Sequence, residues 1–150
     1  MVFWKLISFF CLTVVSAVDY TDNVFIVLSS SKFYFNYRHS LNALQVYQHL
    51  KLSGITDDKI ILMVPTDHAC SPKNIFPGKL YHEESHTYDW NCDDIEVDYK
   101  AEDLTADSIL NLIRGRYDDY LPKSKRLVTG PNTRIFIYFN GHGGENFFKI

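Results

Sequence analysis

The sequence predicts an α/β fold: an open, mostly parallel sheet with flanking helices. Two apolar runs, residues 24–28 (VFIVL) and 60–64 (IILMV), are separated by a helical pattern, and a third run follows at residues 134–139. Continuous runs rich in β-branched and aromatic side chains are typical of parallel strands covered on both faces. The order strand, helix, strand implies a right-handed crossover between parallel neighbours.

The first helix is expected between the first two strands. Apolar residues from Leu41 onward follow helical spacing, Ser40 can cap the start of the helix, and Gly54 stands where a C-terminal cap belongs. Residues 60–64 then repeat the strand pattern, and Pro65 ends it because proline has no backbone N–H for a sheet. Together these segments predict a βαβ unit.

The second half of the chain begins with a long connection. Residues 65–99 are polar and lack a long periodic segment, so they exceed the usual connection of about 2 to 6 residues, and loops of this length usually carry function. Thr105 can cap a second helix, which Gly115 ends. The third strand, residues 134–139, is followed directly by residues 140–144 (NGHGG).

Residues 1–17 have the features of a secretory signal peptide: an early charge at Lys5, an apolar run and the small-residue sequence VSA at the end. The apolar run is shorter than the roughly 20 residues that cross a bilayer. The mature chain is therefore expected to be a single unit, residues 18–150. In an oxidising compartment its two cysteines, Cys70 and Cys92, are candidates for a disulfide, with each other or with another chain.

The composition excludes several classes of protein. The chain has 150 residues, 46% of them apolar, and its 15 basic and 18 acidic side chains give a net charge of −3. This apolar content excludes a disordered tail. A nucleic-acid-binding domain usually carries clustered Lys and Arg, so we expect no nucleic-acid partner.

Three segments should meet at the carboxyl edge of the sheet, where ligands of open α/β folds bind: residues 29–39, the loop after Val64, and residues 141–144. His142, flanked by glycines after a buried strand, is exposed to substrate and is the best general-base candidate. The alternative is a tight turn in which the glycines supply positive φ and the imidazole is incidental.

The sequence offers no obvious nucleophile for this base. Neither Cys70 nor Cys92 directly follows a buried strand, where a rigid nucleophile is usually displayed, and a Gly-x-Ser-x-Gly motif is absent. Because the sequence stops eight residues after His142, we expect the nucleophile on a further strand and the fold to be truncated after the third core strand.

Five segments of the sequence form a recognisable set: residues 36–39 (NYRH), 67–74 (DHACSPKN), 96–99 (EVDY), 124–127 (SKRL) and 138–144 (YFNGHGG). They resemble the catalytic subunits of glycosylphosphatidylinositol (GPI) transamidases. These subunits are legumain-like cysteine peptidases of the caspase-like clan, with a catalytic His after one strand and a Cys after the next, so the resemblance implies a caspase-like fold. Two positions depart from the family pattern: Ala101 stands where Gly is usual, and Asn140 where Thr is common.

The resemblance implies roles for three residues. His142 is the catalytic base, Asn36 helps to orient it, and the backbone N–H of Gly143 contributes to the oxyanion hole. These roles agree with thiol chemistry, because an imidazole raises the thiolate fraction and a polar partner on its other nitrogen fixes the tautomer. For Asn36 the alternative is a turn-forming residue with no catalytic role.

The resemblance also implies a structural calcium ion and an intersubunit disulfide. The ion would be held by the carboxylates of Asp57, Glu96 and Asp98 and the carbonyl of Ile60, which are the hard oxygen ligands that calcium prefers. No organic cofactor is expected. Cys70 would be linked to a neighbouring subunit, the alternative being a free or internally paired thiol.

The implied activity is replacement of a proprotein's C-terminal signal peptide by a preassembled GPI lipid, through a Cys thioester. The implied setting is a membrane-bound complex with other subunits in the lumen of the endoplasmic reticulum. One alternative is a legumain-like asparaginyl endopeptidase, but Gly141 favours the transamidase because legumains typically have Asp before the His. The other alternative is a non-catalytic binding subunit, if the chain truly ends at Ile150.

Overall fold

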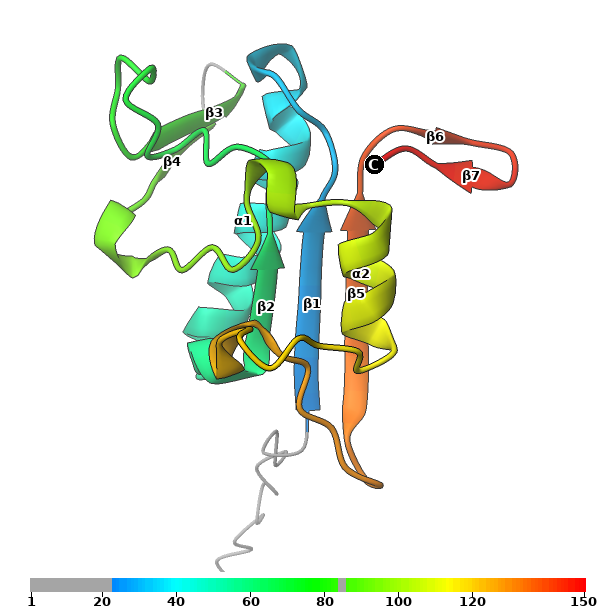
Figure 1. The fold of residues 1–150 in the computed structure, drawn as a ribbon. Coiled ribbons are helices and arrows are strands. Elements are labelled where there is room, and N and C mark those ends of the chain that lie inside the picture. The colour runs from blue at the N-terminus through cyan, green and yellow to red at the C-terminus, as the bar shows by residue number, and fades with distance from the viewer. Residues whose placement is uncertain (1–22, 84–85) are drawn as a thin grey trace, which may run out of the picture.

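A three-stranded parallel sheet in the order β2-β1-β5 forms the centre of the computed structural model, which describes residues 23–83 and 86–150 (Figure 1). The register pairs Phe25 with Ile60 on one side and with Phe136 on the other. The predicted signal peptide, residues 1–17, lies outside the described residues. The strands of this sheet are β1 (Asn23–Ser29), β2 (Ile60–Met63) and β5 (Arg134–Asn140).

The two main helices cover opposite faces of the sheet. Alternate residues of β1 point to opposite faces, so Val27 packs in the cluster that contains α1 (Tyr37–Leu52), and Ile26 packs in the cluster that contains α2 (Ala106–Ile113). Both residues are fully buried. Burial of such a side chain contributes about 1.5–3 kcal/mol, so β1 anchors two layers of apolar packing at once. This arrangement confirms the predicted α/β class and the parallel βαβ unit.

The ends of the helices agree with the sequence in part. Thr105 caps α2 as predicted, in a capping box with Ser108, and Gly54 follows α1 with a φ of 85°, the left-handed conformation that glycine adopts readily. Ser40 was predicted as the N-cap of the first helix, and this prediction is wrong. The helix begins four residues earlier, at Tyr37, with Asn36 as its N-cap, because polar residues in its first turn hide the start of the apolar periodicity.

The connection between β2 and α2 contains an antiparallel hairpin, β3 (Lys79–Glu83) with β4 (His86–Asp89), that the sequence pattern did not predict. Gly78 precedes the hairpin with a φ of 79°, and a Cβ there would lie 2.4 Å from the carbonyl oxygen of Trp90. The remaining short elements are η1 (Tyr34–Asn36), η2 (Asp57–Lys59), η3 (Cys92–Asp94), η4 (Ala101–Asp103), η5 (Lys123–Lys125), β6 (Gly143–Gly144) and β7 (Phe147–Phe148).

Strand β5 is the exposed side of the sheet. It pairs with β1 along one edge, and no strand among the described residues pairs with its other edge. Its apolar side chains are open to solvent, with 47% of Phe136 and 46% of Ile137 exposed. Such an edge is a template for further pairing. Within residues 23–83 and 86–150, no helix has the length and apolar character needed to cross a membrane.

Ala101 provides a test of the backbone conformation in the loop before α2. Its φ is 44°, a left-handed conformation that costs a residue with a Cβ about 1–2 kcal/mol and that glycine adopts without this cost. Ala101→Gly should therefore raise the free energy of unfolding by about 1 kcal/mol, even though glycine adds entropy to the unfolded chain. Gly54→Ala, at a φ of 85° with nothing within 4 Å of a new Cβ, should lower it by a similar amount. Urea unfolding measures both changes, and a neutral or destabilising Ala101→Gly would contradict the left-handed conformation.

Candidate active site at the carboxyl edge of the sheet

Because β1, β2 and β5 are parallel, their carboxyl ends lie at one edge of the sheet, and the segments that follow them meet there (Figure 1). After β1 the chain continues to η1 and the start of α1, and after β5 it continues to the short β6-β7 hairpin. The predicted convergence of residues 29–39 with residues 141–144 is confirmed.

His142 and Asn36 contact each other at this edge, although 106 residues separate them. Nε2 of His142 lies 3.0 Å from Oδ1 of Asn36, and the imidazole is exposed. The amide of Asn36 also donates from Nδ2 to the carbonyl oxygen of Lys32, at 3.4 Å, which directs its oxygen toward the ring. An amide oxygen can only accept, so Nε2 of His142 carries the proton and Nδ1 is left with a free lone pair.

His39 supports the ring of His142 from the buried side. The two ring centroids are 4.9 Å apart at an interplanar angle of 77°, an edge-to-face arrangement. Nδ1 of His39 is 2.6 Å from Oγ of Ser31. Burial lowers the pKa of His39, and the charges of Arg38 and His142 lower it further. His39 is therefore neutral at pH 7 and packs against His142 as an uncharged ring.

The glycines around His142 provide room for close packing. None of Gly141, Gly143 and Gly144 has a positive φ, so the alternative of a tight turn built on glycine φ angles does not describe this segment. A Cβ at Gly141 would lie 2.1 Å from Oγ of Ser30, and one at Gly143 would lie 2.9 Å from the carbonyl oxygen of Phe147. Glycine at these positions lets the hairpin approach β1 closely.

Two hydrogen bonds then hold the β6-β7 hairpin in place. The N–H of Lys149 donates to the carbonyl oxygen of His142 at 2.8 Å, and the hydroxyl of Ser30 donates to the carbonyl oxygen of Lys149. Gly143, the predicted oxyanion donor, opens β6, which pairs with Phe148 of β7. The sequence did not identify Ser30, Ser31 or His39 as part of this arrangement. The run of three serines after the first strand was the available signal, since small residues permit close approach.

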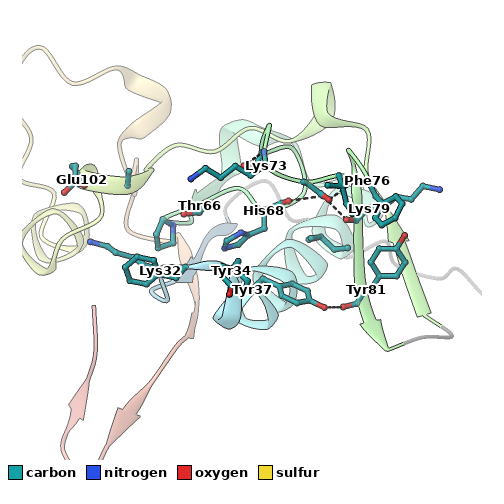
Figure 2. A pocket seen from close by; sticks show the side chains of 17 residues that line it. Lys32, Tyr34, Tyr37, Thr66, His68, Lys73, Phe76, Lys79, Tyr81 and Glu102 are labelled. Atoms are coloured by element: carbon teal, nitrogen blue, oxygen red, sulfur yellow. Dashed lines mark hydrogen bonds between the residues drawn. The ribbon is translucent and has the colours of Figure 1, made fainter.

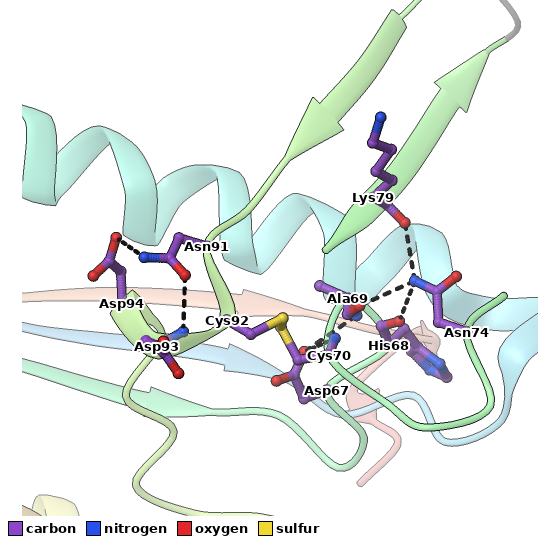
Figure 3. Close-up of a disulfide and its surroundings, with 10 residues drawn as sticks. All are labelled: Asp67, His68, Ala69, Cys70, Asn74, Lys79, Asn91, Cys92, Asp93 and Asp94. Atoms are coloured by element: carbon purple, nitrogen blue, oxygen red, sulfur yellow. Dashed lines mark hydrogen bonds between the residues drawn. A yellow bond between two sulfur atoms is a disulfide. The ribbon is translucent and has the colours of Figure 1, made fainter. Parts of the chain in front are cut away.

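Cys70 and Cys92 form a disulfide within the chain (Figure 3), with their Cα atoms 5.6 Å apart. The expected intersubunit bond from Cys70 is therefore replaced in this structure by the alternative of an internally paired thiol. The two cysteines lie in turns that side-chain oxygens organise, since Asp67 accepts from the N–H of Cys70 and Asn91 accepts from the N–H of Asp93. Both cysteines in the described part of the chain are thus bonded, and neither offers a thiol to His142.

The acidic residues predicted to bind calcium lie beside β2 and the turn that precedes it. Asp98 is buried, its carboxylate accepts from the N–H of Leu62 at 2.9 Å, and the charges of Glu96 and Asp57 act on it. Asp57 is already engaged, because it pairs with the ammonium of Lys51 and accepts from the hydroxyl of Tyr47 at 2.6 Å.

The structure describes how the predicted calcium ligands lie relative to one another. No group of three or more His, Cys, Asp or Glu side chains among the described residues is placed to hold a metal ion. The ammonium of Lys51 supplies the positive charge next to Asp57. The predicted set of Asp57, Ile60, Glu96 and Asp98 is brought to one region but is not assembled around a single point.

The parallel α/β sheet carries a His–Asn pair at its carboxyl edge, an arrangement suited to proton transfer. The chain belongs to the peptidase C13 family, whose model matches residues 23–150. It is 43% identical to the GPI-anchor transamidase of Saccharomyces cerevisiae over 130 residues, which cover 87% of this chain and 32% of the relative. It is 39% identical to the GPI-anchor transamidase of Schizosaccharomyces pombe (88% of this chain, 35% of the relative) and 38% identical to that of Homo sapiens (87% and 33%). The chain thus spans about a third of the length of these relatives.

The contact with Asn36 predicts the tautomer of His142. When neutral, the ring should carry its proton on Nε2, and Asn36→Ala should shift the ring toward a mixture of the two tautomers because the acceptor is lost. Long-range nitrogen–proton NMR spectra of the imidazole distinguish the tautomers directly. Asn42→Ala, on the outer part of α1, is the matched control and should leave the spectrum unchanged. A wild-type ring protonated mainly on Nδ1 would contradict the geometry.

Asp98 predicts a dependence of stability on pH. Burial, with smaller contributions from Glu96 and Asp57, raises its pKa from 3.8 to about 7, against the opposing hydrogen bond from Leu62. Between these two values the folded state holds a proton that the unfolded state releases. The contribution of Asp98 to the free energy of unfolding therefore falls as the pH rises from about 4 to about 7, by up to about 4 kcal/mol, and is constant above that range.

Urea unfolding at a series of pH values, in the presence of a chelator, measures this effect. Asp98→Asn keeps an acceptor for the N–H of Leu62 but cannot titrate, so the free energy of unfolding of the wild type should rise relative to that of the variant as the pH falls from 8 to 4. Parallel stability curves for the two proteins would show that Asp98 titrates at its ordinary pKa.

Proposed function

We propose that this chain supplies the histidine half of the catalytic centre of a GPI-anchor transamidase. The observation that carries the proposal is the hydrogen bond between His142 and Asn36 at the carboxyl edge of a peptidase C13 sheet. The similar proteins are GPI-anchor transamidases, which supports this activity, and the identity to them is spread over most of this chain.

In the proposed reaction, Nδ1 of His142 takes the proton of a cysteine thiol, and the thiolate attacks the carbonyl carbon of the proprotein. The carbon–nitrogen bond then breaks, and the imidazolium returns the proton to the leaving amine, which carries away the C-terminal signal. The product is a thioester. Asn36 holds the ring in the correct tautomer throughout, and the N–H of Gly143 is the proposed donor to the tetrahedral oxyanion.

The second half of the reaction repeats these steps with another nucleophile. The terminal amine of the GPI lipid attacks the thioester, His142 accepts the proton of that amine, and the cysteine leaves as the thiol. We assign the thiol to a segment outside residues 1–150. This assignment is supported by the bond between Cys70 and Cys92 and by the greater length of the relatives.

The setting is part of the same proposal. The signal-peptide pattern of residues 1–17 and the disulfide support an oxidising compartment, for which the lumen of the endoplasmic reticulum is proposed. The exposed apolar surface of β5 supports contact with further parts of the enzyme, and other subunits of a membrane-bound complex are proposed as partners.

Structural calcium remains a proposal that needs a rearrangement of the acidic region. Lys51 would release Asp57, which could then join Asp98, Glu96 and the carbonyl of Ile60. Its support is the proximity of two carboxylates, Glu96 and Asp57, to the buried carboxylate of Asp98. Millimolar calcium chloride, compared with chelator, should raise the melting temperature of the wild type and leave that of Asp98→Asn unchanged. An equal response of both proteins would remove the ion from the proposal.

The activity is tested on the full-length protein that contains this chain. A proprotein with a labelled C-terminal peptide is incubated with a soluble primary amine, and mass spectrometry separates the amine-capped product from the hydrolysed one. His142→Ala should lower the rate of both products by roughly 10²–10⁴, the usual contribution of a general acid–base. Asn36→Ala should lower it less, with an altered pH profile, because the ring loses its orientation.

The acceptor in this assay distinguishes the proposal from the endopeptidase alternative. Amine-capped product that grows with amine concentration supports a transamidase. Cleavage of a free Asn-containing peptide with water as the only acceptor, in the absence of other subunits, would support a legumain-like peptidase instead. A fully active His142→Ala protein would contradict the catalytic role of this residue. Gln48→Ala, on α1, is the control for effects of mutation and purification on the measured rate.

A further inference from the structure

A pocket separate from the His142–Asn36 contact opens at the same edge of the sheet, beyond the carboxyl end of β2 (Figure 2). Its volume is about 630 Å³, within the range of pockets that bind small ligands or several side chains. The walls come from η1, from the loop after β2 and from the β3-β4 hairpin. Neither His142 nor Asn36 lines it, so the proposed chemistry does not use this space.

The pocket is lined mainly by aromatic and aliphatic side chains that remain open to solvent. Tyr34 is 78% exposed, Ile75 is 83% exposed and Phe33 is 66% exposed. Phe33 also adopts a φ of 71°, an unfavourable conformation for a residue with a side chain. Contiguous exposed apolar surface together with local backbone strain is typical of a binding site.

The mouth of the pocket is positively charged in a protein that is acidic overall. Lys32, Lys73 and Lys79 line it, and Glu102 is the one acidic residue among the lining residues. Asp89 lies 4.0 Å from Lys79 and offsets part of its charge. The net charge of the whole chain is −3, so this concentration of lysines is local. Charge complementarity favours an occupant with an acidic group.

Two polar side chains of the pocket are already engaged within the protein. The amide of Asn74 donates to the carbonyl oxygens of His68, Ala69 and Lys79, and the hydroxyl of Tyr37 donates to the carbonyl oxygen of Tyr81. A phosphate group needs several convergent hydrogen-bond donors, and these two side chains already donate to carbonyl oxygens of the protein. The surface instead suits an apolar side chain inside the pocket and a single acidic group at the mouth.

His68 provides one polar group inside. Its Nε2 is buried and has no hydrogen-bond partner within the described part of the chain. Burial lowers the pKa of this imidazole, so it is neutral at pH 7 and offers one hydrogen bond to the backbone of an occupant. A buried polar atom without a partner destabilises the folded chain, and a bound peptide group that pairs with Nε2 would relieve this cost.

The wall of the pocket is continuous with the catalytic pair. The carbonyl oxygen of Phe33 accepts from the N–H of Asn36 at 3.1 Å, and the carbonyl oxygen of Lys32 accepts from the side chain of the same residue. Residues 32–34 therefore line the pocket on one side and hold Asn36 on the other. A peptide that reaches His142 along the sheet edge can continue into this space.

We propose that this pocket binds a segment of the peptide substrate that places one large apolar side chain among Phe33, Tyr34 and Ile75 and an adjacent acidic group against Lys32 and Lys73. The identity of the occupant as substrate rests on the proposed function. The chemistry of recognition, an apolar side chain beside an acidic one, rests on the lining alone.

Fluorescence anisotropy with dye-labelled short peptides tests the proposal on this chain, without catalysis. The probe peptide contains Leu beside Asp, and two comparison peptides replace the Leu by Ala or the Asp by Lys. The probe should bind at least about tenfold more tightly than either, and its affinity should fall with added salt because exposed charges are screened. Equal affinities for all three peptides would overturn the proposal.

Protein variants locate the binding. The double variant Lys32→Glu with Lys73→Glu should lose the preference for Asp and gain one for Lys, whereas Arg114→Glu with Lys123→Glu, the same charge change on other exposed residues, should bind as the wild type does. If the pocket variant misfolds, nitrogen NMR of the wild type replaces it, and the Nε2 resonance of His68 should shift when the probe binds. An unmoved His68 resonance in the presence of bound probe would overturn the proposal.

Further outcomes separate this proposal from other occupants and from the proposed function. Displacement of the probe by phosphoethanolamine or inorganic phosphate at lower concentrations than by unlabelled peptide would overturn it in favour of a phosphate site. If the peptides bind as expected but the full-length enzyme transfers no amine, the proposed function fails and the pocket stands. If amine transfer depends on His142 but peptide binding is unaffected by the Lys32 and Lys73 substitutions, the proposed binding pocket is wrong and the proposed function is still supported.

Discussion

The parallel pairing of β1 with both of its neighbours is the constraint on which the candidate site depends. Because all three strands run in one direction, the segments that leave their carboxyl ends are forced to the same edge of the sheet. The pairing is strongly specified, since β1 is buried on both faces and a shift by one residue would exchange the side chains that face α1 and α2. The position of Asn36 relative to His142 follows from that register.

Close packing then turns proximity into a defined contact. The absence of a side chain at Gly141 lets the segment after β5 lie against Ser30, and Ser30 holds the end of the hairpin through Lys149. His39 fills the space beneath His142 and stays neutral because it is buried. The imidazole is therefore exposed toward solvent and supported from the protein side, which is the arrangement a general base requires.

The long connection after β2 contributes as much to the surface as the sheet does. The disulfide between Cys70 and Cys92 and the hairpin β3-β4 give it a defined shape, although it has few buried apolar residues. One side of this connection carries the lysine-lined pocket and another carries the acidic region around Asp98. Groups of opposite charge are thus held apart in a chain whose net charge is small.

Local patterns in the sequence were sufficient for the three strands of the central sheet, for the cap at Thr105, for the glycine at the end of α1 and for the choice of His142 as the general-base candidate. The role of Asn36 was implied by the family resemblance. These features depend on a few neighbouring residues, whose spacing and backbone preferences are visible in the sequence. The start of α1, the hairpin β3-β4, the partner of Cys70, the packing of His39 and the lysine-lined pocket became evident in the folded chain. Each of them depends on contacts between residues far apart in sequence or on the volume left between packed segments, and no local periodicity encodes those distances.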